Sequence, residues 1–216
     1  MKTEKKNKYF PGLCLCGITL IFSILSCVVD RQPIGYEGTT VGFASLNGAF
    51  HNAFGYNGTM DTISDIVMYF SFLVVACFAV YGVKLLVKEK SIAKVSKVIL
   101  GLGILYVVVA VLYVAFKKIP INFRPILQPG ETELETSFPS THTLVIASVL
   151  GSAVVAVRKL FSNKNMVKAV TVIFAILIVV GVAARLFAGV HWMTDIVAGL
   201  LFSASLISLY AAWGLN

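Results

Sequence analysis

Apolar residues along this chain gather into six stretches that are separated by short polar segments. The stretches cover residues 9–29, 63–87, 96–116, 143–158, 168–187 and 192–213. A helix needs about 20 mainly apolar residues to cross the hydrocarbon core of a bilayer, and lipid offers a spanning backbone no water to bond with. The pattern therefore predicts an all-α protein, a bundle of six transmembrane helices. The fourth stretch is short, so we expect its helix to tilt little or to be extended by neighbouring residues.

The composition excludes an ordinary soluble protein. Hydrophobic residues make up 58% of the chain and charged residues only 13%, whereas soluble domains carry about 25% charged residues. No internal repeat, low-complexity tract or second soluble domain is visible, so residues 1–216 are expected to form a single integral membrane domain. The four cysteines lie in or beside apolar stretches without the spacing of a metal site, and buried thiols are the simplest interpretation.

The basic residues lie mostly on one side of the predicted membrane. Of the 18 Lys and Arg residues, 13 precede the first stretch or surround the second and fourth connections. Because cytoplasmic loops carry the excess of Lys and Arg, this face is predicted to be cytoplasmic, with both termini on it. The chain is therefore expected to be a multi-pass protein of the cell membrane, with its active site on the extracytoplasmic side. The net charge of +8 is spread over short loops and forms no single basic patch, so no nucleic-acid partner is expected.

On the opposite face, residues 30–62 form a segment rich in Gly, Asn and aromatic residues. Between Val41 and Phe54 the apolar residues recur at mixed three- and four-residue spacing. This spacing fits a short amphipathic helix that lies flat at the membrane interface, and it fits a plain surface loop equally well.

Two other segments on this face, residues 117–142 and 184–195, carry the candidate chemistry. They contain two of the three histidines and four of the five basic residues predicted on this side. Polar groups that distant loops hold at the ends of membrane helices are expected to be functional, because burying them there is expensive. The side chains of interest are Lys117, Arg124, Ser140, Thr141, His142, Arg185, His191 and Asp195.

These residue types suit phosphoryl transfer. Arginine offers a planar fork of donors to phosphate oxygens, and lysine adds a compact charge. Ser140 and Thr141 precede the fourth stretch, and backbone N–H groups at a helix N-terminus favour an anion. His191 and Asp195 are four residues apart, so we expect them to share a helix face, where the carboxylate holds one ring proton and leaves the other nitrogen free to attack. His142 supplies a second imidazole that is able to protonate a leaving oxygen.

Three motifs occur in order along these segments: K-x6-R-P from Lys117, P-S-x-H ending at His142, and R-x5-H-x3-D from Arg185. Together they resemble the signature of the type 2 phosphatidic acid phosphatase superfamily, which also includes vanadium haloperoxidases and bacterial undecaprenyl pyrophosphate phosphatases. Six spans extend the resemblance to most of the chain.

The resemblance implies a role for each matching position. His191 would be the nucleophile and form a phosphohistidine, Asp195 would orient it, and His142 would be the general acid. The phosphate would be held by Lys117, Arg124, Arg185, Ser140 and the Thr141 amide. Neither a metal nor another cofactor is implied.

Some positions depart from the pattern or lie outside it. Thr141 stands where the family usually has Gly, and Ala184 where it usually has Ser. The first adds bulk beside the phosphate, and the second removes a hydroxyl whose neutral hydrogen bond is worth about 1 kcal/mol. Glu131, Glu133 and Glu135 are expected to form a solvated acidic loop.

The sequence thus predicts an enzyme that removes phosphate from a membrane lipid on the extracytoplasmic side. Undecaprenyl pyrophosphate is favoured as the substrate, with phosphatidylglycerophosphate, phosphatidic acid and diacylglycerol pyrophosphate left open. A transporter of anions or lipids, or a membrane protein that binds lipid without turnover, is the alternative of another class. A transporter is expected to show interrupted helices or internal symmetry, and neither is evident. The sequence gives no oligomeric state.

Overall fold

The computed structural model describes residues 7–214, and this part of the chain is helical without a single β-strand. Six helices are long and apolar enough to cross a membrane, which confirms the predicted all-α fold with six spans. They are α1 (Phe10–Val28), α3 (Gly58–Glu89), α4 (Lys97–Phe116), α5 (Thr141–Leu160), α6 (Lys164–Phe187) and α7 (Met193–Gly214). The shorter elements are α2 (Ala44–Phe54) and the 3₁₀ turns η1 (Tyr36–Gly38) and η2 (Ile92–Lys94).

Two spans begin earlier than hydropathy predicts, because an asparagine caps each of them. Helix α3 starts five residues before the expected position, and the Asn57 side chain accepts hydrogen bonds from the Thr59 and Met60 amides at 3.1 Å. Asn163 caps α6 in the same way. Such a side chain satisfies amide groups that a helix leaves unpaired at its start, so polar residues can begin a helix outside the apolar stretch.

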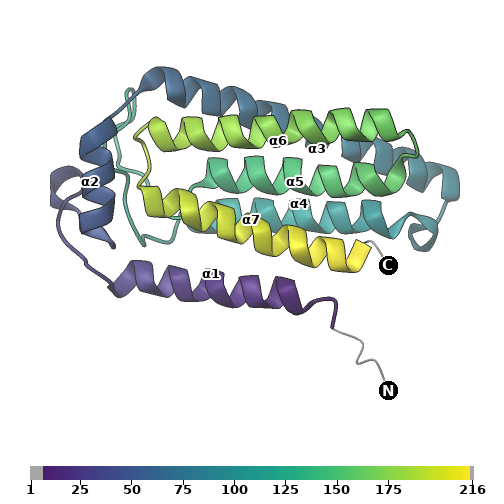
Figure 1. Cartoon of the computed structure of the whole chain (residues 1–216), viewed down its shortest axis with the longest axis horizontal. Helices are drawn as coiled ribbons and strands as arrows, with labels where there is room; N and C mark the ends of the chain where they lie inside the picture. Colours follow the sequence, from purple (N-terminus) through teal and green to yellow (C-terminus); the bar gives the residue numbers. More distant parts are fainter. Residues whose placement is uncertain (1–6, 215–216) are drawn as a thin grey trace.

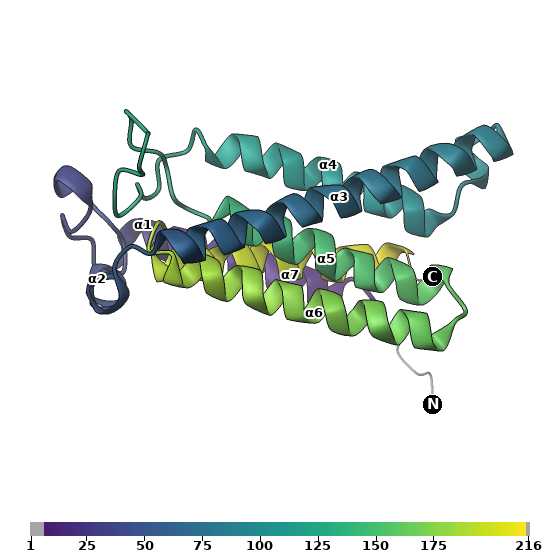
Figure 2. The same ribbon diagram turned by 90° about the horizontal axis from the view of Figure 1, so that it is seen from above.

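Helix α5 lies at the centre of the bundle. It packs against α3, α4, α6 and α7, whereas α1 packs mainly on α7 (Figures 1 and 2). Small polar residues allow the close approach of α5 and α7, as where the Ser148 hydroxyl donates to the Ser203 hydroxyl at 3.0 Å. The helix of the fourth, short apolar stretch is 20 residues long. Neighbouring residues therefore extend it, which was one of the two ways in which it was expected to cross the membrane. The central position of α5 fixes the place of the residues at its N-terminus.

Helix α2 lies across one end of the bundle, almost at right angles to the spans (Figure 1). Of the two interpretations of the Val41–Phe54 segment, the structure confirms a helix, over Ala44–Phe54, and its place at the membrane interface stays a prediction. The buried Asn47 side chain donates to the Thr194 hydroxyl at 2.9 Å and accepts from the Thr194 amide at 3.2 Å. These bonds fasten α2 to the start of α7.

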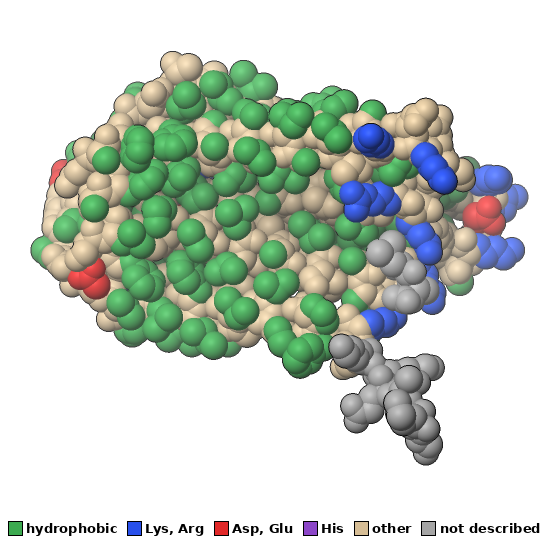
Figure 3. Space-filling view, in the orientation of Figure 1, with side chains coloured by type: hydrophobic (Ala, Val, Ile, Leu, Met, Phe, Trp, Pro, Cys, Tyr) green, Lys and Arg blue, Asp and Glu red, His purple; other side chains and the backbone are tan. Residues whose placement is uncertain are grey.

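Charged side chains on the face of the molecule shown in Figure 3 are divided between its two ends. The Lys and Arg side chains visible there gather at the end opposite α2, and the flank between is largely apolar. The first residues of α1 and the last of α7 lie at that same basic end (Figure 1). Which end faces the cytoplasm remains a prediction from the charge pattern.

Candidate active site

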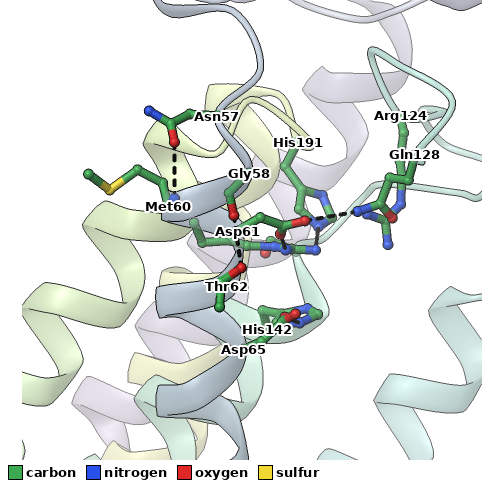
Figure 4. A network of polar contacts seen from close by, with 12 residues as sticks. Asn57, Gly58, Met60, Asp61, Thr62, Asp65, Arg124, Gln128, His142 and His191 are labelled. Carbon is green, nitrogen blue, oxygen red and sulfur yellow. Dashed lines mark hydrogen bonds and ion pairs between the residues drawn. The ribbon is translucent and has the colours of Figure 1, made fainter. Parts of the chain in front are cut away.

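The polar residues singled out in the sequence converge at the end of the bundle that α2 covers. They come from five places in the fold: the loop after α4, the start of α5, the end of α6, the turn before α7 and the first turn of α7. Figure 4 shows Arg124, His142 and His191 facing a common region from three sides. The structure therefore brings together residues that lie as far apart in the chain as Lys117 and Asp195.

Two buried arginines supply donors that the protein does not use. Arg185 is 1% exposed, and it forms an ion pair with Asp61 through Nη1 and donates from Nη2 to His191 Nε2 at 3.2 Å. Arg124 is 7% exposed and binds Glu135 at 2.6 Å through Nη2. Nε of Arg185 and both Nε and Nη1 of Arg124 have no partner among the described residues. Buried unpaired donors are costly, so these nitrogens are suited to an anion.

His191 is held with its Nε2 free of a proton. A guanidinium only donates hydrogen bonds, so the 3.2 Å contact with Arg185 makes Nε2 of His191 the acceptor. Burial, together with the positive charges of Arg185 and Arg124, lowers the pKa of His191 well below the ordinary value of 6.5. The ring is therefore neutral near pH 7, which is the form that a nucleophile requires.

Asp195 lies beside His191 without forming a close hydrogen bond to it. The distance from Asp195 Oδ2 to His191 Nδ1 is 3.7 Å. Asp195 instead accepts from the Trp192 amide at 3.0 Å and from Asn122 Nδ2 at 3.3 Å. The expectation that the pair shares a helix face is wrong, because α7 begins only at Met193 and His191 lies in the turn before it.

That turn is anchored to its surroundings on both sides. The buried Trp192 donates from its indole nitrogen to the Phe123 carbonyl at 2.7 Å, which ties the third motif to the first. Gly189 has a φ of +71°, and a Cβ at this position would overlap the Gly55 carbonyl. The position therefore requires glycine both for its left-handed backbone and for the close approach of the chain that follows α2.

The remaining predicted residues lie at the edge of the site. Lys117 is half-exposed, 3.7 Å from Glu135. Ser140 is fully buried and caps α5, accepting from the Thr143 amide at 3.4 Å, and its own amide donates to the Asp195 carbonyl at 3.0 Å. Thr141 is the first residue of α5. The Ser140 hydroxyl is thus engaged with its own helix.

Three carboxylates in the site were not found from the sequence. Asp61 and Asp65 lie one turn apart at the start of α3, where they pair with Arg185 and His142 respectively. Glu135 was assigned to a solvated loop, but it pairs with both Lys117 and Arg124. The available signal was the position of Asp61 and Asp65 at the edge of an apolar stretch, since acidic residues there are seldom free of function.

An apolar groove borders the site between α3, α4 and α5. It begins with a cavity of about 400 Å³ that contains Val145, one turn along α5 from His142, and Tyr113, one turn before Lys117. A second cavity, of about 470 Å³, adjoins it and shares Val75 and Tyr106. Helices α3 and α4 lie well apart at the end that carries the site (Figure 2). We call this feature the α3–α4 groove. The residues of its first cavity are Phe72, Val75, Tyr106, Val109, Ala110, Tyr113, Val114, Val145 and Val149.

Within residues 7–214, no group of three or more His, Cys, Asp or Glu side chains is arranged to hold a metal ion. Comparison with known proteins gives two matches. The sequence profile of the PAP2 superfamily matches residues 97–216. The fold is similar to the crystal structure of a transmembrane PAP2-type phosphatidylglycerolphosphate phosphatase from Bacillus subtilis, with a TM-score of 0.62 and 20% identity over 94% of each chain. Comparison with curated protein sequences finds no match.

Proposed function

The chain belongs to the PAP2 superfamily, and we propose that it is a membrane phosphatase that removes a phosphate group from a lipid. One observation carries the proposal: two buried arginines keep unpaired donors, and one of them, Arg185, contacts the unprotonated Nε2 of His191. Donors that are fixed around the position where charge develops are often the largest contribution to such catalysis.

In the first step of the proposed reaction, His191 Nε2 attacks the phosphorus while Arg124 and Arg185 hold the phosphate oxygens. The new P–N bond forms as the bond from phosphorus to the lipid oxygen, or to the bridging oxygen of a diphosphate, breaks. A proton from His142 passes to that leaving oxygen. In the second step water attacks the phosphohistidine, its proton returns to His142, and the P–N bond breaks to release phosphate. Both steps use side chains that this site contains.

The α3–α4 groove supports a lipid as the substrate. Its lining is almost entirely apolar, and it starts one helical turn from His142. A hydrocarbon tail lying there would place its phosphate at the site without leaving the bilayer. Because the tail is already surrounded by hydrocarbon in the bilayer, the groove would act on it through shape and van der Waals packing and not through removal from water.

Undecaprenyl pyrophosphate remains our favoured substrate, with phosphatidylglycerophosphate as the main alternative. The second is supported by the similar structure, whose protein is described as a phosphatidylglycerolphosphate phosphatase. Phosphatidic acid and diacylglycerol pyrophosphate share the same phosphate chemistry. The excess of basic residues at the opposite end supports an extracytoplasmic site.

The test is phosphate release by the purified protein in detergent from each of these four lipids. Release by the wild type, and its loss in His191→Ala, would support the enzyme, and the rank order of kcat/KM would identify the preferred lipid. A protein that releases phosphate from none of them, but still binds them, would favour a lipid-binding or transport role instead.

A further inference from the structure

We propose that Asp65 is a positioning residue for His142, and that it directs the proton of the general acid toward the leaving oxygen. Asp65 belongs to none of the three motifs and lies on a helix that precedes all of them. The proposal rests on the proposed function, because it assigns Asp65 a part in the same reaction.

The contact that carries this inference joins α3 to α5. Asp65 Oδ1 lies 2.8 Å from His142 Nε2, and the two helices pack side by side. The His142 side chain is 13% exposed, whereas that of Asp65 is 41% exposed. The other ring nitrogen, Nδ1, is buried and has no partner among the described residues. In Figure 4 the two side chains lie together below Asp61.

This geometry determines which nitrogen of His142 exchanges a proton. A carboxylate accepts hydrogen bonds, so Nε2 of His142 carries its proton toward Asp65. The proton that the reaction uses is then the one on Nδ1, the nitrogen without a protein partner. During the reaction Nδ1–H protonates the leaving oxygen as the P–O bond breaks, and it regains a proton from water as the P–N bond breaks. Asp65 keeps Nε2–H throughout and does not itself become protonated.

The neighbouring carboxylate on α3 has a different partner. Asp61, one turn earlier, pairs with Arg185, which binds the phosphate in the proposed reaction. In the proposed reaction Asp65 therefore acts, through His142, on protonation of the leaving group, whereas Asp61 acts, through Arg185, on phosphate binding. Both lie on one face of the same helix. Effects on leaving-group protonation are expected from Asp65 alone.

The experiment compares two substrates that differ in their need for a proton. An alkyl lipid phosphate has a poor leaving group, whereas p-nitrophenyl phosphate has a good one. In Asp65→Ala we expect kcat/KM for the lipid, which reports only the steps up to phosphohistidine formation, to fall on the order of 10²-fold, with a much smaller loss of kcat/KM for the aryl phosphate. Asp65→Glu should recover part of the lipid activity. Asp61→Ala should affect both substrates alike, and Thr62→Ala, an exposed neighbour on α3, should match the wild type.

A double variant distinguishes positioning from a general structural effect. If Asp65 acts through His142, Asp65→Ala should cost little more in a His142→Ala background. Equal losses on both substrates, or additive losses in the double variant, would overturn the inference while leaving the phosphatase intact. A wild type inactive toward every lipid phosphate would instead refute the proposed function. The elution profile of each variant on size exclusion identifies one that has failed to fold, in which case Asp65→Asn replaces it.

Discussion

Arg185 Nη2 and His191 Nε2 lie 3.2 Å apart, so one buried guanidinium contacts the candidate nucleophile while its other terminal nitrogen pairs with Asp61. A lysine at position 185 offers one compact ammonium in place of the planar fork, so it cannot reproduce the geometry of both contacts. We expect Arg185→Lys to lower kcat/KM on the order of 10²-fold in steady-state assays. Arg158→Lys, at the opposite end of the bundle, is the control that should leave kcat/KM unchanged.

The pH profile should reflect the environment of His191. It faces Arg185 from α6, Arg124 from the loop after α4, His142 from α5 and Asp195 from α7. Because burial lowers the pKa of His191 well below 6.5, the ring stays neutral as the pH falls to 6.5 and gains a proton only further down. We therefore expect kcat/KM to fall on the acid side only well below pH 6.5.

The alkaline limb should belong to the proton on His142, giving a bell-shaped profile. Measuring kcat/KM for one lipid between pH 4 and 9 checks both limbs. A profile that is already falling steeply between pH 7.5 and 6.5 on its acid side would contradict the neutral form of His191. A flat profile would contradict the pairing of a base with an acid.

The α3–α4 groove predicts dependence on tail length. Ala110 is exposed and lines the groove, so Ala110→Phe should fill part of it without disturbing the core. We expect a higher KM for a long-chain lipid phosphate and no change for a short-chain analogue. Val111→Phe is the matched control, because Val111 is 61% exposed on the same helix and does not line the cavity. Equal behaviour of the two variants would place the tail elsewhere.

Gly199 maintains the contact between α7 and the start of α5. A Cβ there would lie 2.9 Å from the Ser140 carbonyl and from the Thr143 Cβ, so Gly199→Ala should move the N-terminus of α5. Overpacking of this kind costs about 1–3 kcal/mol, and we expect a lower Tm and a lower kcat. Gly103→Ala meets no atom within 4 Å and should leave both unchanged. A kcat for Gly199→Ala equal to that of the wild type would show that the site tolerates this shift.

Membrane orientation is open to direct labelling. In a variant without the four native cysteines, single cysteines at Glu133 and Asn163 mark the two ends of the bundle. An impermeant thiol reagent added to intact cells should label the cysteine at position 133 and not the one at position 163. The reverse pattern would place the site on the cytoplasmic side.

Hydropathy predicted the six spans because lipid requires long apolar helices, and the three motifs drew attention to His142, Arg185 and His191. The carboxylate partners were not predictable in the same way. Asp65 meets His142 across 77 positions of sequence, a contact that depends on the packing of α3 against α5. The first turn of α3 was also missed, because residues 58–62 (Gly-Thr-Met-Asp-Thr) are too polar on average to be taken as part of a membrane span. Spacing predicted that Asp195 lies near His191, but not the turn that keeps them 3.7 Å apart.

Helix α3 has 32 residues, which corresponds to a length of about 48 Å, whereas the hydrocarbon core of a bilayer is about 30 Å thick. The helix must tilt or project from the membrane, and it carries Asp61 and Asp65 in its first turns. Lipid chain length in the surrounding bilayer should therefore alter the height of these carboxylates relative to the headgroups. Bilayer thickness is therefore a variable to which the activity of this site is expected to respond.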